Sequence, residues 1–149
     1  MDTKKLTSAI GNSDPLTASL KKGDHGDSLE LEITAVPISL NALYRTVGKR
    51  MRMTTKGKQF KETWKNIVSA FFYDDLPHYK KGIPITMEVI VYYTDRRRRD
   101  VDNTLKVLLD TFNGVLYADD SQIQSVKVDK VLGSDKLLTK IKLWRVKHA

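Results

Sequence analysis

The chain contains no cysteine. That absence excludes a disulfide framework, a thiolate zinc site and a cysteine nucleophile. Histidine is scarce as well: of the three present, His25 and His148 lie near the ends of the chain and His78 lies in the middle. A multi-histidine metal site is therefore not expected. Any metal would be held by oxygen ligands, which favours Mg²⁺, with Mn²⁺ as a substitute.

Long apolar runs are also missing. No stretch approaches the roughly 18 residues of a membrane-spanning helix, and residues 1–16 lack the apolar segment of a signal peptide. We therefore expect a cytoplasmic protein without a membrane partner. With 149 residues, of which 40% are hydrophobic and 30% charged, the chain has the length and composition of one domain with a buried core.

The charge balance is strongly basic, with a formal net charge of +8. Residues 1–28 carry four lysines and four aspartates, which cancel, so the excess lies within residues 29–149. A basic folded domain favours a polyanionic partner such as nucleic acid, although many basic proteins bind none.

Residues 1–28 are rich in Gly, Ser, Asp and Lys and show no sustained hydrophobic period. This composition predicts a flexible N-terminal tail or, alternatively, an arm that binds a partner. The folded domain is expected to cover residues 29–149.

Hydrophobic periodicity predicts two helices and four strands beyond the tail. Apolar positions recur at helical spacing after residue 54 and again after residue 104, while residues 84–94 alternate between apolar and polar. The order β-α-β-α-β-β indicates an α+β fold with two helices packed on a mixed sheet. The expected strands are Leu29–Val36, Pro84–Thr94, Ile123–Val131 and Leu137–Val146, the last two joined as a hairpin around Gly133; the expected helices run from a cap at Thr54 or Thr55 to about Asp74 and from Asn103 to about Val115.

Four aspartates flank the second predicted helix. Asp100 and Asp102 directly follow a predicted strand, so on an extended backbone their side chains leave on the same side, within reach of one cation. Asp119 and Asp120 follow the helix and approach the first pair only if the chain reverses after it. A divalent cation would relieve the mutual repulsion of such carboxylates and would polarise a phosphoryl oxygen.

Lys106 lies four residues after Asp102, one helical turn further on. There it can bind a scissile phosphate or stabilise charge that develops in a transition state. A purely structural interpretation is also open for each of these residues. Asp102 can be a helix N-cap, Asp102 and Lys106 can form a plain ion pair, and Asp119-Asp120-Ser121 can be a turn.

The first acidic pair is directly preceded by four arginines: Arg96, Arg97, Arg98 and Arg99. An arginine fork binds phosphate through two hydrogen bonds, so the run is a candidate contact for the DNA backbone; alternatively, it neutralises the neighbouring aspartates. Further candidate DNA contacts are Asn41 and Arg45, expected in a loop, and a lysine face of the first helix formed by Lys56, Lys58 and Lys61.

This combination resembles a known family. The RRRDVDN sequence of residues 97–103, the lysine at position 106 and the DDSQ sequence of residues 119–122 are similar to the motifs of the RusA family of Holliday-junction resolvases from bacteria and their phages. Pro37, Asn41 and Tyr44-Arg45 resemble the N-terminal loop of that family more loosely. The resemblance covers about residues 29–146.

The resemblance implies that Asp100, Asp102 and Asp120 are metal-binding catalytic carboxylates and that Lys106 is an essential basic residue, while Asp119 is either a further ligand or orients its neighbour. It also implies a Mg²⁺-dependent homodimer that cuts four-way DNA junctions by paired symmetric nicks in recombination and repair. A two-fold dimer suits the approximate two-fold symmetry of such a junction. The alternatives are a non-catalytic DNA-binding module with the same fold and a small phosphatase or nucleotide hydrolase.

Overall fold

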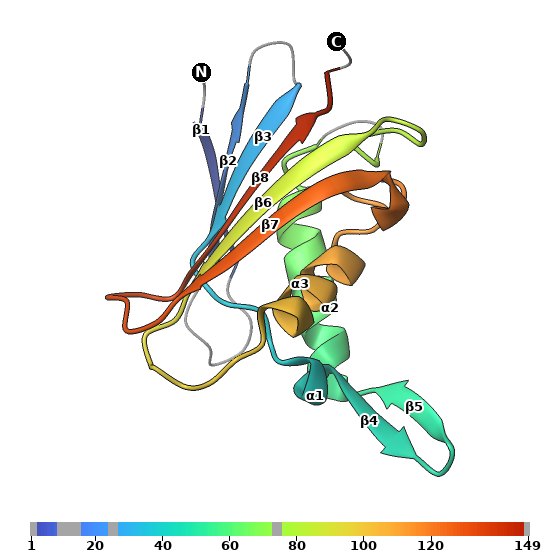
Figure 1. Ribbon diagram of the computed structural model, residues 1–149, viewed down its shortest axis with the longest axis vertical. Helices are drawn as coiled ribbons and strands as arrows, with labels where there is room; N and C mark the ends of the chain where they lie inside the picture. The colour runs from blue at the N-terminus through green and yellow to red at the C-terminus, as the bar shows by residue number, and fades with distance from the viewer. Residues whose placement is uncertain (1–2, 9–15, 24–26, 73–75, 148–149) are drawn as a thin grey trace.

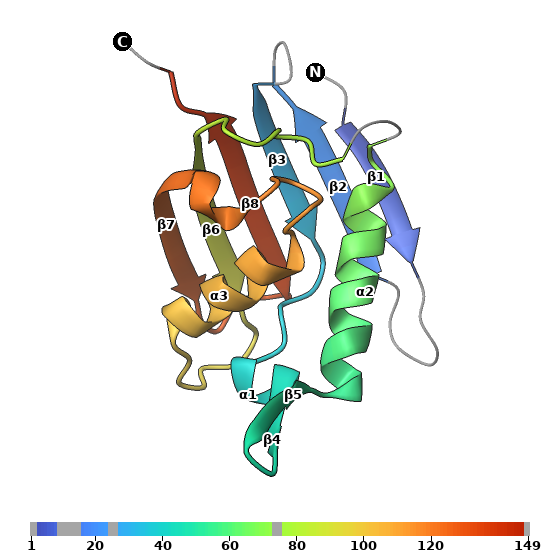
Figure 2. The same cartoon turned by 90° about the vertical axis from the view of Figure 1, so that its right-hand side faces the viewer.

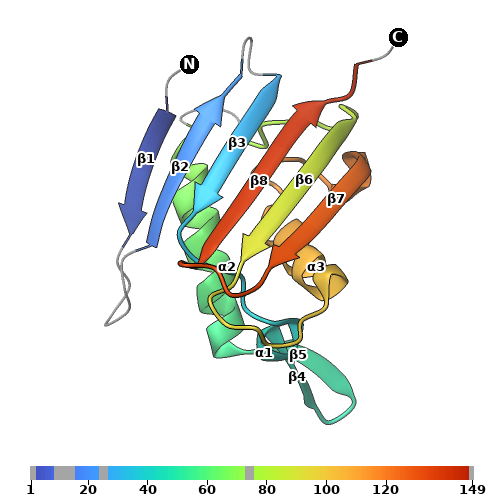
Figure 3. The same cartoon turned by 60° about the vertical axis from the view of Figure 1, so that its left-hand side comes forward.

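The computed structural model describes residues 3–8, 16–23, 27–72 and 76–147. Its main sheet has six strands, and the two long helices lie on one face of that sheet (Figures 1 and 2). Figure 3 shows the opposite face, which no helix covers within the described residues. The strands of the main sheet are β1 (Thr3–Ser8), β2 (Leu16–Lys22), β3 (Ser28–Ile33), β6 (Ile85–Tyr92), β7 (Ile123–Val131) and β8 (Leu138–Arg145).

The order across the main sheet is β1-β2-β3-β8-β6-β7. Neighbouring strands are antiparallel except for β6 and β7, which run parallel. Parallel strands need a crossover connection, and the helix α3 provides it between β6 and β7. The helices are α1 (Leu40–Leu43), α2 (Thr55–Ser69) and α3 (Val101–Thr111), and a separate two-stranded hairpin consists of β4 (Tyr44–Val47) and β5 (Arg50–Met53).

The core lies between the sheet and the two long helices. In β6 every second residue from Ile85 to Val91 is buried, because side chains alternate between the two faces of a strand. The helices contribute apolar stripes, with Phe60 and Trp64 on α2 and Leu108 on α3. Burial of each large apolar side chain stabilises the fold by roughly 1.5–3 kcal/mol, and this packing holds α3 against the sheet.

The α+β class is confirmed, but the prediction of a flexible tail is wrong for most of the described part of residues 1–28. β1 and β2 extend the sheet by two antiparallel strands beside β3. Ala18 and Leu20 of β2 are buried. β1 contains a single large apolar residue, Leu6, and β2 only three apolar residues, Leu16, Ala18 and Leu20. These are too few for a sustained hydrophobic period, so the local sequence does not reveal the two strands.

The predicted hairpin of the last two strands is also wrong. β7 has the predicted bounds and those of β8 are close, but β6 lies between the two strands in the sheet. A short connection between two strands looks like a hairpin in sequence, and periodicity does not show which strands are neighbours. The predicted order of six elements is incomplete as well, because β1, β2, α1, β4 and β5 all precede α2.

The segment before α2 is more regular than the predicted loop. Asn41 lies in α1 and Arg45 in β4. Thr54 caps α2 as predicted, since its hydroxyl oxygen accepts a hydrogen bond from the N–H of Gly57 (2.9 Å). The helix ends at Ser69 rather than near Asp74, and residue 74 lies outside the described residues. None of the helices in the described segments is long and apolar enough to cross a membrane.

Candidate active site

The loop between β6 and α3 carries the arginine run and is organised by Asp95. The Asp95 carboxylate accepts hydrogen bonds from the backbone N–H of Arg97 (3.0 Å) and from both terminal nitrogens of Arg99, with Nη2 2.9 Å from Oδ2. The Arg99 guanidinium also lies over the Tyr93 ring, 4.0 Å from its centroid. The hydrogen bonds from Arg99 and Arg97 hold the pKa of Asp95 well below its usual range, and the same pairing raises the pKa of Arg99.

The rest of the arginine run faces solvent. Arg96, Arg97 and Arg98 are exposed, whereas the Arg99 side chain is 27% exposed. Gly133, in the loop after β7, lies under the Arg96 guanidinium: a Cβ there would be 2.9 Å from Arg96 Nη2, and its φ of +67° also favours glycine. Arg99 therefore shapes the loop, whereas the other three arginines are exposed and pair with no carboxylate at hydrogen-bond distance within the described residues.

The helix α3 begins one residue after Asp100. Asp100 is the N-cap by its backbone conformation (φ −91°, ψ 124°), yet its carboxylate makes no capping hydrogen bond. Asp102 lies inside the first turn, so Asp102 is not the cap and the backbone is not extended through both residues. Both carboxylates are exposed, and the positive end of the helix dipole favours negative charge there. Two predicted ligands therefore come from the amino end of α3.

One face of α3 carries Asp102, Lys106 and Asp110, each four residues from the next. Within the described part of the chain, no ion pair joins Lys106 to either aspartate. The structure therefore does not show the ion-pair alternative for Asp102 and Lys106. Asp110 is not among the predicted site residues, although the spacing that selects Lys106 also leads to it.

The chain reverses after α3, as the approach of the second acidic pair requires. Gly114 has a φ of +84°, and its N–H donates to the carbonyl of Tyr117 (2.7 Å). The Tyr117 hydroxyl donates back to the carbonyl of Leu109 on α3 (2.8 Å). Burial raises the pKa of this hydroxyl, and the nearby charges of Asp120 and Asp110 raise it further. Tyr117 thus links the turn to α3 and brings Asp120 to the carboxyl-terminal half of that helix.

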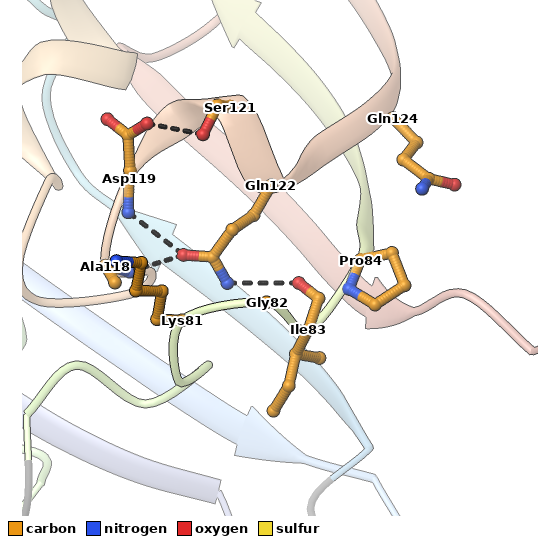
Figure 4. Close-up of a pocket in the computed structure, with 9 residues that line it drawn as sticks. All are labelled: Lys81, Gly82, Ile83, Pro84, Ala118, Asp119, Ser121, Gln122 and Gln124. Carbon is orange, nitrogen blue, oxygen red and sulfur yellow. Dashed lines mark hydrogen bonds between the residues drawn. The ribbon is translucent and has the colours of Figure 1, made fainter.

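A buried glutamine fixes the turn that carries Asp119 and Asp120 (Figure 4). The side-chain oxygen of Gln122 accepts hydrogen bonds from the N–H groups of Ala118 (2.8 Å) and Asp119 (2.9 Å). Its side-chain nitrogen donates to the carbonyls of Lys80 (2.8 Å) and Ile83 (3.0 Å) in the segment before β6. In the sequence, Gln122 stands out only as part of the DDSQ motif, because its partners are backbone groups of segments that no local pattern connects.

The first aspartate of the turn, Asp119, is already engaged within it. Its carboxylate accepts a hydrogen bond from the Ser121 hydroxyl, and this bond lowers the pKa of Asp119. The next residue, Asp120, begins a short 3₁₀ helix, η2 (Asp120–Gln122), and is half-buried. The turn predicted from the Asp119-Asp120-Ser121 sequence is therefore present, and its two carboxylates have different surroundings.

Asp100 borders a groove between the β6–α3 loop and the segment that leads into α1. The groove holds about 200 Å³, which is below the roughly 300 Å³ at which pockets for organic ligands begin. It has room for a phosphate group or a few water molecules. Its polar lining includes Asn41, Arg98, Asp100 and Asn103. The structure therefore brings three predicted DNA contacts, Asn41, Arg98 and Arg99, next to a predicted catalytic carboxylate.

The remaining predicted DNA contacts lie on β4 and at the start of α2. Arg45, Lys56 and Lys58 are exposed, and Lys61 is half-buried. The first turn of α2 contains no acidic residue, although the positive end of the helix dipole favours acids there and disfavours lysine. The lysines at the start of α2 therefore do not stabilise the helix through its dipole, so a contribution to helix stability does not explain their position.

The chemistry of the predicted metal ligands fits a hard divalent cation, but their arrangement fits it only in part. All predicted ligands are carboxylates, which suits Mg²⁺. Within the described residues, no group of three or more acidic or histidine side chains is arranged to hold a metal, so Asp100, Asp102 and Asp120 do not form one ligand cluster. Mg²⁺ is often bound by one or two carboxylates together with phosphate oxygens of the substrate. Asp100 and Asp102 at the amino end of α3 fit such a partial site.

Comparison with known proteins defines the class. The family model described as "Endodeoxyribonuclease RusA" matches residues 33–143, which include α2, β6, α3, β7 and the whole candidate site. The crossover junction endodeoxyribonuclease rusA of Enterobacteria phage HK97 is 31% identical over 93 residues, which is 62% of this chain and 74% of the phage protein. The protein is therefore an enzyme of the endodeoxyribonuclease class. The chain belongs to the RusA family.

Proposed function

We propose that the protein is a Mg²⁺-dependent endonuclease that resolves four-way DNA junctions in the cytoplasm by paired, symmetric phosphodiester hydrolysis. The observation that carries the proposal is the pair of exposed carboxylates at the amino end of α3, one turn from Lys106 and beside a groove lined by Arg98. The similar phage protein is a crossover junction endodeoxyribonuclease, which supports branched DNA as the substrate and recombination and repair as the setting.

In this proposal, Asp100 and Asp102 hold the cation, and Asp120 is the third catalytic carboxylate, presented by the turn after α3. Bound Mg²⁺ would supply charge neutralisation and polarise a phosphoryl oxygen of the scissile phosphate. Lys106, on the same helix face as Asp102, stabilises the negative charge that develops on the phosphate in the transition state. Asp119, bonded to the Ser121 hydroxyl, orients the turn.

The DNA backbone is bound by the basic residues around the site. Asn41, Arg98 and Arg99 line the same groove as Asp100, and Asp95 holds the Arg99 guanidinium in its position there. Each phosphate contact contributes about −0.9 to the slope of log affinity against log salt concentration for binding to duplex DNA. The other proposed contacts are Arg96, Arg97, Arg45, Lys56, Lys58 and Lys61.

We also propose that the enzyme acts as a homodimer. Each copy of the chain contributes one set of the catalytic residues named above, and paired symmetric nicks need two. A two-fold dimer places two equivalent sites on a substrate that itself has approximate two-fold symmetry.

The substitution Asp102→Asn tests the catalytic assignment because it removes a charge and keeps the size of the side chain. We expect binding of a labelled four-way junction to be largely unchanged and nicking in the presence of Mg²⁺ to fall roughly a thousandfold or more. The matched control is Asp129→Asn, at an exposed aspartate of β7 that pairs with Lys127 (3.9 Å); it should nick normally. Full nicking activity of Asp102→Asn would contradict the assignment.

A further inference from the structure

The positive charge of this protein is concentrated in one segment. Residues 33–61 contain seven Lys or Arg residues and no Asp or Glu. The rest of the chain holds 19 basic and 18 acidic residues, so this segment supplies +7 of the formal net charge of +8. Four of its seven cations belong to the β4–β5 hairpin and its turn: Arg45, Lys49, Arg50 and Arg52.

The β4–β5 hairpin stands apart from the main sheet. It is a separate two-stranded sheet, and Figures 1 and 2 show it extending from the body of the molecule beside α1. The β6–α3 loop reaches the same end of the molecule. Asn41 of α1 lines the groove that Asp100 borders, only a few residues before the hairpin begins. The hairpin therefore starts at the edge of the candidate active site.

The root of the hairpin is firmly held, whereas its tip is exposed. At the root, Leu43 is fully buried, the Thr54 hydroxyl donates to the carbonyl of Ala42 (2.6 Å), and a Cβ on Gly57 would lie 2.6 Å from the Leu43 carbonyl oxygen. Near the tip, Met51 is 74% exposed. A fixed root sets the direction of the hairpin before any partner binds, which lowers the entropy cost of binding.

The two faces of the hairpin differ in chemistry. Arg45 lies opposite Arg52, and Val47 lies opposite Arg50, so three guanidinium groups share one face. Thr46 and Met51 lie opposite each other on the other face. Like charges directly opposite each other destabilise a strand pair, and a polyanion between them would remove that cost.

We propose that the β4–β5 hairpin inserts into branched DNA, with Arg45, Arg50 and Arg52 on backbone phosphates and Met51 against bases exposed at the branch point. This inference rests on the proposed junction-cleaving function. A two-stranded β-ribbon fits a DNA major groove, and the arginine fork matches phosphate. Apolar side chains of DNA-binding proteins pack between partly unstacked bases. A linear duplex offers the phosphates but no open stack, so Met51 contributes to the preference for junctions.

The arginine part of the proposal is tested by the salt dependence of binding. Binding of a labelled four-way junction, with Mg²⁺ omitted so that no strand is cut, is measured at several salt concentrations. The double variant Arg50→Gln/Arg52→Gln is expected to reduce the slope of log affinity against log salt by about 2. The control Lys127→Gln/Lys142→Gln removes the same charge from exposed residues of β7 and β8 and should keep the slope. An unchanged slope in the hairpin variant, or an equal change in the control, would overturn the proposal.

The methionine part is tested with a junction that carries 2-aminopurine at the branch point, where unstacking raises the fluorescence. The unmodified chain should raise the signal on binding, and Met51→Ser should lose most of that rise while keeping its salt slope. The control Leu76→Ser, at a side chain 41% exposed, should behave like the unmodified chain. A full rise with Met51→Ser would overturn the placement of Met51. If the unmodified chain failed to bind the junction, the proposed function itself would be wrong. If the unmodified chain bound but the hairpin variants behaved like it, only the inference about the hairpin would be wrong.

Discussion

The aspartates before and after α3 have different surroundings. At the amino end, Asp100 and Asp102 are exposed, and the Asp100 carboxylate makes no capping hydrogen bond. In the turn after the helix, the Asp119 carboxylate is bound by Ser121 and its N–H by Gln122. The protein therefore leaves the first two carboxylates accessible to a ligand and uses its own hydrogen bonds to fix the turn that carries Asp120.

The arginine run shows the same division over four residues. Both Arg98 and Arg99 line the groove beside Asp100, but Arg99 is fixed by Asp95 and stacks on Tyr93, whereas Arg98 is exposed. Charged-group pairing inside the protein competes with pairing to DNA, because a guanidinium that holds a carboxylate has fewer N–H donors left for phosphate. The proposed site therefore combines a frame of internally hydrogen-bonded residues, in the β6–α3 loop and in the turn after α3, with exposed charged groups that can bind a ligand.

The largest expected effect on nicking comes from replacing a carboxylate of the turn by an amide. Asp120→Asn should reduce junction nicking roughly a thousandfold or more, as for loss of a catalytic residue. Asp119→Asn should cost much less, because the Asp119 carboxylate is already engaged by Ser121. Nicking rates of the two variants under single-turnover conditions measure the difference. The reverse ranking would make Asp119, rather than Asp120, the catalytic carboxylate of the turn.

A smaller effect is expected when the frame itself is weakened. Gln122→Leu leaves the N–H groups of Ala118 and Asp119 and two carbonyls without their partner, so the free energy of unfolding should fall by about 2 kcal/mol or more. Urea unfolding measures this change. Gln124→Leu is the matched control, at an exposed glutamine of the same region (Figure 4), and should leave stability nearly unchanged. Equal stability of both variants would show that the Gln122 amide does not hold the turn.

The smallest effect is expected at Asp95, and it depends on pH. The folded state depresses the pKa of Asp95 through the Arg99 hydrogen bond, so its stabilising contribution is present above the ordinary aspartate pKa of about 3.9 and is lost as pH falls below it. The unmodified chain should therefore exceed Asp95→Asn in stability at neutral pH, and the gap should narrow below about pH 4. Chemical unfolding at several pH values checks this; a gap that widens in acid would contradict the pairing.

The local sequence pattern predicts much of this fold, because several helices and strands show a clear hydrophobic period. The alternation in β6 and the bounds of β7 follow from the sequence, as does the cap of α2 at Thr54. Which strands lie side by side does not follow, because β6 separates β7 from β8 through contacts that no short window contains. β1 and β2 escape prediction for a related reason: their short, partly polar sequences become strands only against β3.

The candidate site likewise contains residues that the sequence predicts and residues that it does not. Spacing selects Asp100, Asp102 and Lys106 because they lie within one loop and one helix. It also offers Asp110, one further turn along α3. Gln122 could not be identified in this way, since its role depends on the backbone of residues 80–83, which are distant in sequence.

The proposed junction cleavage is tested by incubating the unmodified protein with a labelled four-way junction and with a linear duplex of the same sequence, each with and without Mg²⁺. We expect paired, symmetric nicks in opposite strands of the junction, only when Mg²⁺ is present, with the linear duplex left intact. Equal cutting of the duplex, or no cutting of the junction with Mg²⁺, would contradict this proposal.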